Sequence, residues 1–421
     1  MKRLFTRQGL SLILEYTVGT VLGTLLMFLA LRHYSPQEMG VLAKVQAEIG
    51  ILSVLLTLCL DTPLLNRLAE HKTRGRLLGA TLLLRAGSIV VTLGLALCFA
   101  AMAGQSPTDA LPWLVVVLIP QALSALNVFG IMLYYDNALR WVPKARTGVA
   151  LLFSGIRFLA LWQSASLMSY TLLGVAEGAI GLGLTWWCYR GHGYDIKIRP
   201  CLNTAKTLVV EAAPLILSSF IVTCFFKLDL LLVASLVPAS QLAEYSVAQR
   251  IVECYMVVVM ILLNQYYVWL TAQPHAAKMQ GIAYMTRAGF GLVALVGVAH
   301  LLVVQPLMLH FFKGKYHLGI ELSGLLLLSL LFNVIGTVRG YLFVFEKLNK
   351  WHVPSAAMGI IVLLGGTVLA TRAYGLYGAA SVLILGQAVS VFGSTYLLRP
   401  IRRYHWLLLG VGSMARERSL R

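Results

Sequence analysis

Residues 77–101 read LLGATLLLRAGSIVVTLGLALCFAA, a run of 25 residues in which Arg85 is the only charged side chain. An α-helix rises about 1.5 Å per residue, so a helix of this length crosses the roughly 30 Å hydrocarbon core of a bilayer. The stretch therefore predicts a transmembrane helix that carries one arginine below the membrane surface.

Similar apolar stretches fill the chain on both sides of residues 77–101. Of the 421 residues, 59% are hydrophobic and 12% are charged, whereas a soluble protein carries about 25% charged residues. We therefore expect an all-α polytopic membrane protein, which excludes a soluble enzyme. Hydropathy predicts twelve spans, at roughly 10–31, 41–60, 77–101, 112–137, 147–167, 170–189, 208–236, 243–270, 281–304, 318–345, 353–371 and 375–398.

The charge balance is strongly basic, with 34 Lys and Arg against 16 Asp and Glu. If the N-terminus is cytoplasmic, 23 cations fall in cytoplasmic segments and 7 fall inside spans. The opposite loops hold only 4, which are Arg32, Lys313, Lys315 and Arg372. Cytoplasmic loops carry such an excess of Lys and Arg, so we expect both termini in the cytoplasm. Because these residues are spread over every cytoplasmic turn instead of forming one stripe, no nucleic-acid partner is expected.

A faint internal duplication divides the spans into two sets of six. The motif Gly-x5-Arg-Ala-Gly occurs at 79–87 and again at 281–289. Further matches at nearly the same offset are Asn127-Val128-x-Gly130 with Asn333-Val334-x-Gly336, Tyr170-x-Leu172-x-Gly174-x-Ala176 with Tyr374-x-Leu376-x-Gly378-x-Ala380, and Gln46 and Asp61 with Gln249 and Asn264. An even number of spans per repeat predicts two parallel six-helix lobes around a central cavity that receives the substrate.

The repeat also predicts the boundaries of the lobes. We expect an N-terminal six-helix lobe over 1–190 and a C-terminal six-helix lobe over 208–398. A polar, basic linker over 191–207 joins them on the cytoplasmic side, and a basic cytoplasmic tail covers 399–421.

Charged residues inside the spans are the candidate functional residues, because a charge at mid-membrane costs at least about 2.5–3.5 kcal/mol. Arg157 lies about ten residues into its span, roughly 15 Å deep. Lys44 and Glu48 are spaced i and i+4, and Arg250 and Glu253 are spaced i and i+3, so each pair can share one helix face. These groups either neutralise one another or line a wet cavity that receives an anionic headgroup.

On the cavity interpretation, two sets of residues form the site. The substrate-binding cations are Arg157, Arg250, Arg85, Arg287, Lys44, Lys227 and Arg339. The coupling or ion-pair acids are Glu48, Glu253, Asp229, Glu15 and Glu177. Buried carboxylates bind protons readily, so any of these acids can carry a coupling proton.

The sequence carries no signature of a cofactor, a metal site or a nucleotide site. The six cysteines lie singly in or beside apolar spans with no CxxC spacing, and no GxxxxGK[ST] loop occurs. We therefore expect no cofactor, no metal and no catalytic residue. Transport would draw on an ion gradient or on the gradient of the substrate itself.

Four segments resemble one family of membrane transporters. They are SPQEMG at 35–40, LDTPLLNRLAE at 60–70, FKLDLLL at 226–232 and AEYSVAQR at 243–250. Together with twelve spans they resemble bacterial polysaccharide repeat-unit flippases of the Wzx type, in the multidrug/oligosaccharidyl-lipid/polysaccharide (MOP) exporter superfamily. Ala243 stands where that family often has glycine.

The resemblance implies a flippase in the bacterial inner membrane. Its substrate would be an O-antigen-like oligosaccharide on undecaprenyl pyrophosphate, moved from the inner to the outer leaflet by alternating access. A proton or sodium gradient would drive it, and a polysaccharide polymerase and a chain-length regulator would be partners. The pyrophosphate cannot cross hydrocarbon unaided, and arginine binds phosphate oxygens better than lysine because its fork is bidentate.

Two other functions fit the sequence less well. A major-facilitator-type solute transporter also has two parallel six-helix lobes, but the basic segment at 68–76 only faintly imitates that family's loop, and the linker is short. A membrane glycosyltransferase or polymerase would need a large extramembrane loop, and the longest outer loop predicted here spans only about 305–317.

Overall fold

The computed structural model describes residues 7–68, 74–102, 107–135, 142–191, 199 and 201–411, with the backbone alone described at 7–17, 102, 107–109 and 134. Over these residues the chain consists of helices and turns, and it contains no strand. The all-α fold class predicted from the sequence is confirmed.

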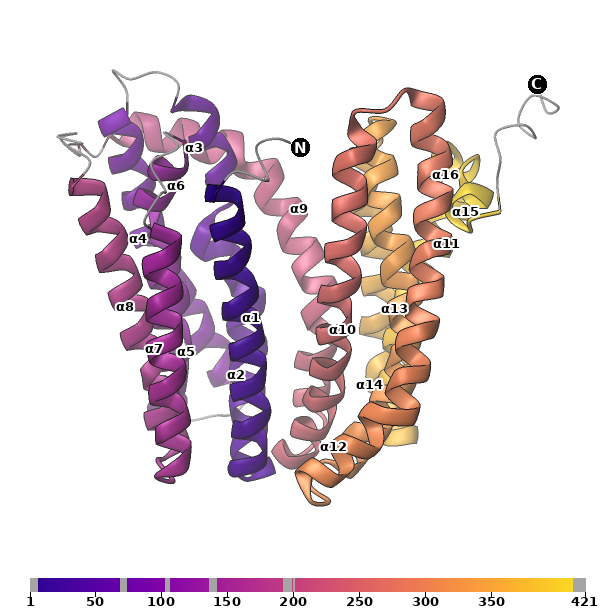
Figure 1. Ribbon diagram of the computed structural model, residues 1–421, viewed down its shortest axis with the longest axis horizontal. Coiled ribbons are helices and arrows are strands. Elements are labelled where there is room, and N and C mark those ends of the chain that lie inside the picture. The colour runs from indigo at the N-terminus through magenta and orange to yellow at the C-terminus, as the bar shows by residue number, and fades with distance from the viewer. Residues whose placement is uncertain are drawn as a thin grey trace. The chain divides into compact units, whose positions relative to one another are not determined.

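The chain forms two compact units, of Met1–Ser35 with Val45–Thr223 and of Pro36–Lys44 with Cys224–Arg421. Apart from Pro36–Lys44, the chain passes from one unit to the other within α9 (Leu202–Ala234). The predicted linker over 191–207 ends before this crossing, and its residues 202–207 form the start of α9. Figure 1 shows the helices of each unit running roughly side by side. The helices up to α9 are α1 (Arg7–His33), α2 (Pro36–Thr57), α3 (Asp61–Arg67), α4 (Arg74–Met102), α5 (Pro107–Ala125), α6 (Val128–Tyr135), α7 (Val142–Trp162), α8 (Leu167–Gly191) and α9 (Leu202–Ala234).

The second unit continues with long helices and several short ones. The long helices are α10 (Ala239–Thr271), α11 (His275–Ala299), α13 (His317–Phe345) and α14 (His352–Ala388). The short helices are α12 (Gln305–Phe312), α15 (Ser394–Leu397), α16 (Arg399–Arg402) and α17 (His405–Leu408). Two π-helical segments, His300–Val304 and Val389–Gly393, interrupt this series.

The described helices account for the predicted membrane spans. Ten of them are long and apolar enough to cross a bilayer. The last of the ten, Asn349–Leu397, has 49 residues, and at about 1.5 Å per residue it would be more than twice as long as the hydrocarbon core is thick. It therefore supplies two spans, and the apolar part of α1, Val18–His33, supplies one more. A fold with about twelve membrane-spanning helices is therefore in line with the described helices.

Two glycines make the sharp turn that divides α14. Gly375 has φ 58° and ψ −142°, a conformation that is open to glycine and strained for other residues. A Cβ atom on Gly378 would lie 2.0 Å from the carbonyl oxygen of Ala370. Any larger side chain at Gly378 would force the two parts of α14 apart.

Two predicted elements differ from the structure. The predicted span 112–137 is broken at Leu126 and Asn127, where α5 ends and α6 begins. The predicted outer loop at 305–317 is wrong over 305–312, because these residues form α12. The chain remains apolar into Phe311 and Phe312, so the helix continues until Lys313 adopts a left-handed conformation.

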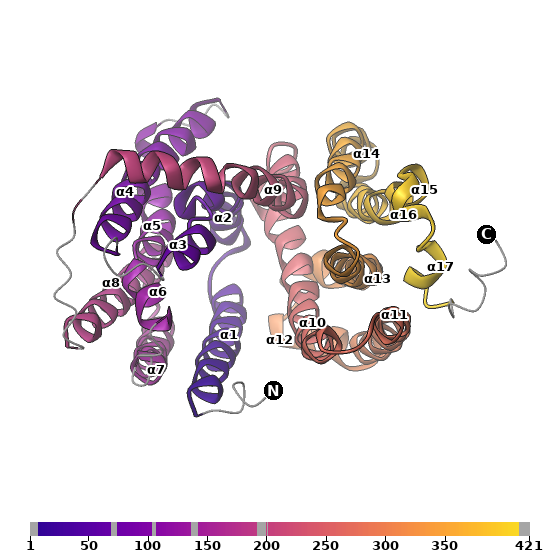
Figure 2. The same ribbon diagram turned by 90° about the horizontal axis from the view of Figure 1, so that it is seen from above.

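The core of the first unit forms along a helical seam of α2. Val45, Ile49, Leu52 and Leu56 follow the i, i+4, i+7, i+11 spacing of one helix face and pack on small and apolar residues of α4 and α5. A second cluster places Ala205, Leu208 and Ala212 of α9 against Leu64, Leu68, Leu77 and Leu78. In Figure 2 this first part of α9 lies across the ends of α2 and α4.

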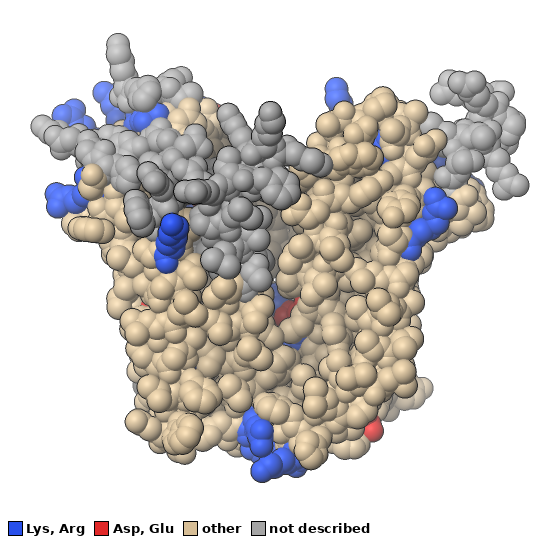
Figure 3. Space-filling model, viewed as in Figure 1, with Lys and Arg blue, Asp and Glu red and all other residues tan. Residues whose placement is uncertain are grey.

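Charged side chains are sparse along the middle of the helices. Figure 3 shows a broad band of uncharged surface, with the visible Lys and Arg gathered mostly towards its two ends. Large apolar side chains are exposed on many helices, for example Leu152 at 60% and Leu302 at 73%. Such a surface is suited to contact with lipid tails.

Candidate functional site

A cavity of about 370 Å³ lies within the first unit, among α1, α5, α7 and α8. Its polar lining comes from Ser124, Asn127, Arg146, Arg157 and Glu177. The remaining lining consists of glycine, proline and aliphatic residues. The cavity is large enough for a phosphate group or a sugar ring, and too small for a whole lipid-linked oligosaccharide.

One face of α7 supplies two cations to this cavity. Arg146, Val149, Ala150 and Arg157 all line it, and their spacing places them on one side of the helix. Arg146 and Arg157 are 11 residues apart, which is about 16 Å along the helix axis. The cavity therefore has a positively charged wall that extends over about three turns of α7.

Glycines on α8 make the space opposite that wall. Gly174, Gly178 and Gly181 all line the cavity. A Cβ atom on Gly174 would lie 3.3 Å from Nη2 of Arg157, whereas one on Gly181 would meet no atom within 4 Å. The absence of side chains at these positions leaves room for the arginine and for a ligand beside it.

Arg157 and Glu177 form an ion pair inside the cavity. Nη2 of Arg157 lies 2.7 Å from Oε2 of Glu177, and the two side chains are 21% and 29% exposed. The pair is therefore partly buried yet open to a ligand that enters the cavity. A ligand anion would compete with the Glu177 carboxylate for the same guanidinium group.

Asn127 reaches the cavity because the helix breaks there. The side-chain oxygen of Asn127 accepts a hydrogen bond of 3.3 Å from the backbone N–H of Gly130, in the first turn of α6. This bond orients the Asn127 amide beside α7 and α8. Neither Asn127 nor Arg146 was among the predicted site residues, although the spacing of Arg146 and Arg157 on one helix face is visible in the sequence.

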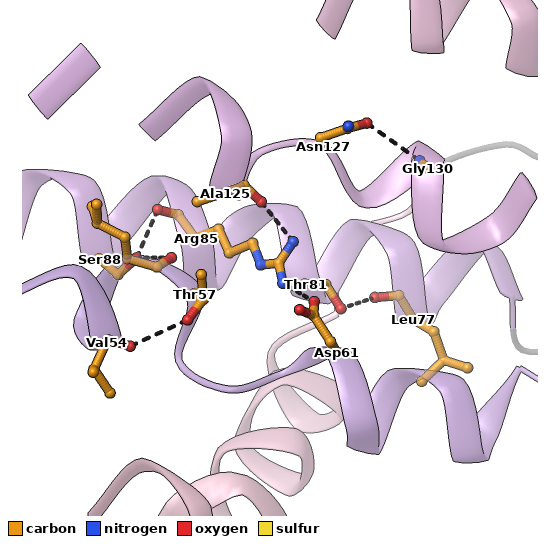
Figure 4. A network of polar contacts seen from close by, with 11 residues as sticks. Val54, Thr57, Asp61, Leu77, Thr81, Arg85, Ser88, Ala125, Asn127 and Gly130 are labelled. Carbon is orange, nitrogen blue, oxygen red and sulfur yellow. Dashed lines mark hydrogen bonds and ion pairs between the residues drawn. The ribbon is translucent and has the colours of Figure 1, made fainter. Parts of the chain in front are cut away.

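Arg85 is buried within the first unit, with 2% of its side chain exposed. Its Nη1 donates a hydrogen bond to the carbonyl oxygen of Ala125, and its Nη2 forms an ion pair with Asp61 (Figure 4). Ala125 is the last residue of α5. The guanidinium thus joins the end of α5 to the start of α3, which favours a structural role over substrate binding.

In the second unit, Lys227, Arg250 and Glu253 form one cluster on α9 and α10. Nζ of Lys227 lies 2.9 Å from Oε1 of Glu253, and Nη1 of Arg250 lies 3.6 Å from Oε2 of the same residue. All three side chains are partly exposed. The predicted i, i+3 pair is therefore present, and Lys227 adds a second positive charge to it.

Asp229 is separated from that cluster, although it is only two residues from Lys227. Its side chain is 1% exposed, and its Oδ2 accepts hydrogen bonds from the hydroxyl of Tyr245 at 3.0 Å and from the amide of Gln249. Its Oδ1 has no hydrogen-bond partner in the described part of the chain. Residues two apart point to different faces of a helix, which explains why the neighbouring charges do not pair.

Arg339 and Arg287 have contrasting environments in the second unit. Arg339 is 5% exposed, and its Nη1 donates to the carbonyl oxygens of Ser390 and Val391 and to the hydroxyl of Ser394. These carbonyls lie in the π-helical segment Val389–Gly393. Arg287 is exposed and lies beside Gly410. A Cβ atom added to Gly410 would be 2.7 Å from Cγ of Arg287.

The remaining predicted site residues lie on α1 and α2. Glu48 is buried and Lys44 is half-buried, both on α2. The side chain of Glu15 lies outside the described residues. Of the predicted site residues, the structure thus brings together Arg157 with Glu177 in one unit and Lys227, Arg250 and Glu253 in the other.

Comparison with known proteins shows which solved structures have a similar fold. No known family profile and no curated protein sequence matches this chain. Among solved structures it is similar to the lipid II flippase MurJ in an inward closed conformation, with a TM-score of 0.67 and 13% identity over 94% of this chain and 90% of that one. It is also similar to an inward-facing multidrug resistance MATE transporter of the MOP superfamily, with a TM-score of 0.64 and 12% identity over 94% and 99%.

A third structure, the Vibrio cholerae MATE transporter VcmN, gives a TM-score of 0.57 at 12% identity over 95% of this chain and 98% of that chain. The three similarities extend over almost the full length of both partners in each comparison. The major-facilitator alternative finds no support among these neighbours. The chain therefore has the same all-helical fold as these transporters.

Proposed function

We propose that this chain is a flippase that moves an undecaprenyl-pyrophosphate-linked oligosaccharide from the inner to the outer leaflet of the bacterial inner membrane. The observation that carries the proposal is the cationic wall of Arg146 and Arg157 on α7, in a cavity sized for a headgroup. The MurJ structure with the same fold is described as a lipid II flippase. That description and the four segments that resemble Wzx-type flippases favour a lipid-linked glycan.

The chemistry of such a substrate fits the residues of both units. A pyrophosphate is an anion that needs charged donors when it leaves water, and arginine provides two parallel N–H donors to phosphate oxygens. Arg157 provides such a fork in one unit, and Lys227 and Arg250 provide two cations in the other. The isoprenoid tail needs no polar partner and would remain in lipid.

Energy coupling can involve the embedded acids. Glu177, Glu253 and Asp229 all lie near a cation or a hydrogen-bond donor in the structure. Exchange of a proton or a sodium ion at one of them would link transport to an ion gradient. A repeat-unit polymerase and a chain-length regulator would act on the flipped product.

Export of a cationic drug is the second candidate, because several structural neighbours are MATE transporters. An organic cation needs an uncompensated carboxylate in the binding cavity. Here the carboxylate in the described lining of the first unit's cavity, Glu177, is already paired with Arg157 at 2.7 Å. An organic cation would therefore have to displace Arg157 from it, whereas an anion could bind the guanidinium, which favours an anionic ligand.

The test is transport in proteoliposomes loaded with a radiolabelled undecaprenyl-pyrophosphate oligosaccharide, with and without an imposed proton gradient. We expect the labelled glycan to become accessible to an enzyme outside the vesicle. Arg157→Ala should abolish this signal, Arg157→Lys should retain part of it, and Arg402→Ala, at an exposed cation outside the cavity, should leave it unchanged. Transport of an organic cation in place of the glycan would refute the proposal.

The orientation in the membrane has its own test. The excess of cations in one set of loops predicts that a reporter inserted in 191–199 is cytoplasmic and that one inserted in 104–110 is outside. Reporter activity on the opposite side at either position would reverse the direction of transport that we propose.

A further inference from the structure

A second cavity lies in the first unit, where α1 and α7 end. Its volume is about 380 Å³, and it is lined by Leu29, Arg32 and His33 of α1 and by Phe158, Leu161 and Trp162 of α7. These residues are separate from those of the headgroup cavity described above. On the topology that the loop charges predict, this end of the helices lies at the outer face of the membrane.

Beside this cavity, two hydrogen bonds join α1 and the residue after it to the turn after α7 and to α8. The hydroxyl of Tyr34 donates to the carbonyl oxygen of Ala165 at 3.0 Å, which fixes the turn after α7 to the end of α1. The hydroxyl of Tyr170 donates to the carbonyl oxygen of Leu26 at 3.4 Å. Leu161, which also lines the cavity, is 7% exposed. The cavity is therefore a formed feature and not a gap between loose side chains.

Two apolar stripes lead from the cavity along the surface of the helices. On α1, Val21 and Leu25 are exposed by 52% and 55% and continue the face of Leu29 and Arg32. On α7, Leu151 and Phe158 are exposed by 52% and 47% below Trp162. A charged end above two parallel apolar stripes matches the shape of an amphiphile with its head at the interface and its tail in the bilayer.

The cation and the tryptophan are both suited to the headgroup level. Trp162 is 77% exposed, and exposed tryptophans concentrate at the membrane interface. Arg32 is one of only four cations that the sequence places in outer segments. The excess of basic residues on the cytoplasmic side therefore does not account for an arginine at this position.

We propose that this cavity binds the headgroup of an anionic phospholipid of the outer leaflet. The Arg32 guanidinium contacts the phosphate, Trp162 lies against the glycerol region, and one acyl chain follows Leu25 and Phe158. Arg32 is preferred to lysine at such a site because its fork can hold two phosphate oxygens. This site does not depend on which substrate the protein transports.

The test uses the purified full-length protein in nanodiscs of phosphatidylcholine that contain a small fraction of phosphatidylglycerol. Native mass spectrometry counts the phosphatidylglycerol molecules that remain bound to the protein after it is released from the nanodisc. We expect Arg32→Gln to weaken retention by about tenfold, the usual effect of losing one charge-assisted hydrogen bond. Arg32→Lys should retain part of the binding, and Trp162→Ala should weaken retention as well.

The matched control is Arg372→Gln, because Arg372 is exposed and belongs to the same set of outer cations but lies outside this cavity. It should retain phosphatidylglycerol as the unsubstituted protein does. Equal loss in Arg372→Gln and Arg32→Gln would show general charge attraction and overturn the proposal. Displacement of the lipid by inorganic phosphate alone, or by a short oligosaccharide, would also overturn it. Circular dichroism of each variant excludes misfolding as the cause.

Discussion

Replacement of Glu177 by glutamine should strengthen the binding of a pyrophosphate to the headgroup cavity. In the structure the Glu177 carboxylate lies 2.7 Å from Nη2 of Arg157, where a ligand phosphate would bind. The carboxylate therefore competes with the ligand for the guanidinium. Glutamine keeps the size of the side chain and removes the competing charge.

The size of the effect follows from the exposure of the pair. Two unit charges about 4 Å apart interact by about 4 kcal/mol at an effective dielectric constant of about 20. Arg157 and Glu177 are 21% and 29% exposed, so solvent screening reduces the interaction to about 1–2 kcal/mol. This corresponds to an affinity gain of about 5- to 30-fold in Glu177→Gln.

The assay is isothermal titration of the detergent-solubilised protein with farnesyl pyrophosphate, a short isoprenoid pyrophosphate. The control is Glu211→Gln, because Glu211 forms an ion pair with Arg67 on the same unit, with side chains 41% and 39% exposed, outside the cavity. The double substitution Arg157→Ala with Glu177→Gln should lose the gain. Unchanged or weaker binding in Glu177→Gln, together with a lower unfolding temperature, would refute the reasoning and make the pair structural.

Three further outcomes follow from the geometry. Asp61→Asn should lower the free energy of unfolding by about 3–5 kcal/mol, because it leaves the buried Arg85 cation, 2% exposed, without its counter-charge. Arg85→Ala should also destabilise the fold, because it removes a buried side chain and its hydrogen bond to Ala125; thermal unfolding in detergent measures both. Gly181→Leu should fill the headgroup cavity and stop transport while the protein still accumulates, whereas Gly291→Leu, at another glycine with open space around it, should transport normally. Hydrogen bonds from Tyr404 and His275 outweigh the effect of burial and lower the pKa of Glu346 below 4.5. The stability that this carboxylate provides is present above about pH 4.5 and is lost as the pH falls through its lowered pKa; Glu346→Gln should remove that part of the acid sensitivity, and an unchanged pH profile of unfolding would contradict it.

The partners of the embedded charges illustrate what a sequence can predict. Arg250 and Glu253 share a helix face at i, i+3, and the structure confirms their contact at 3.6 Å. Lys227 is two residues from Asp229 in the sequence, but in the structure it forms its ion pair with Glu253 on α10. A contact within one helix follows from helix geometry, whereas a contact between helices depends on how they pack.

The sequence by itself determined the helices. Each span is set by a local run of apolar residues long enough for the bilayer, and even the turn at Gly375 follows from glycine's freedom at positive φ. The depth of Arg157 could also be read from its place in its span. Only the tertiary structure decided that Arg85 is buried against Asp61 and Ala125, whereas Arg157 faces a cavity with Arg146 and Glu177. The two arginines look alike in sequence because each stands alone in an apolar run. Their environments differ because side chains on neighbouring helices, distant in the chain, either fill the space around the guanidinium or, as glycines on α8 do, leave it open.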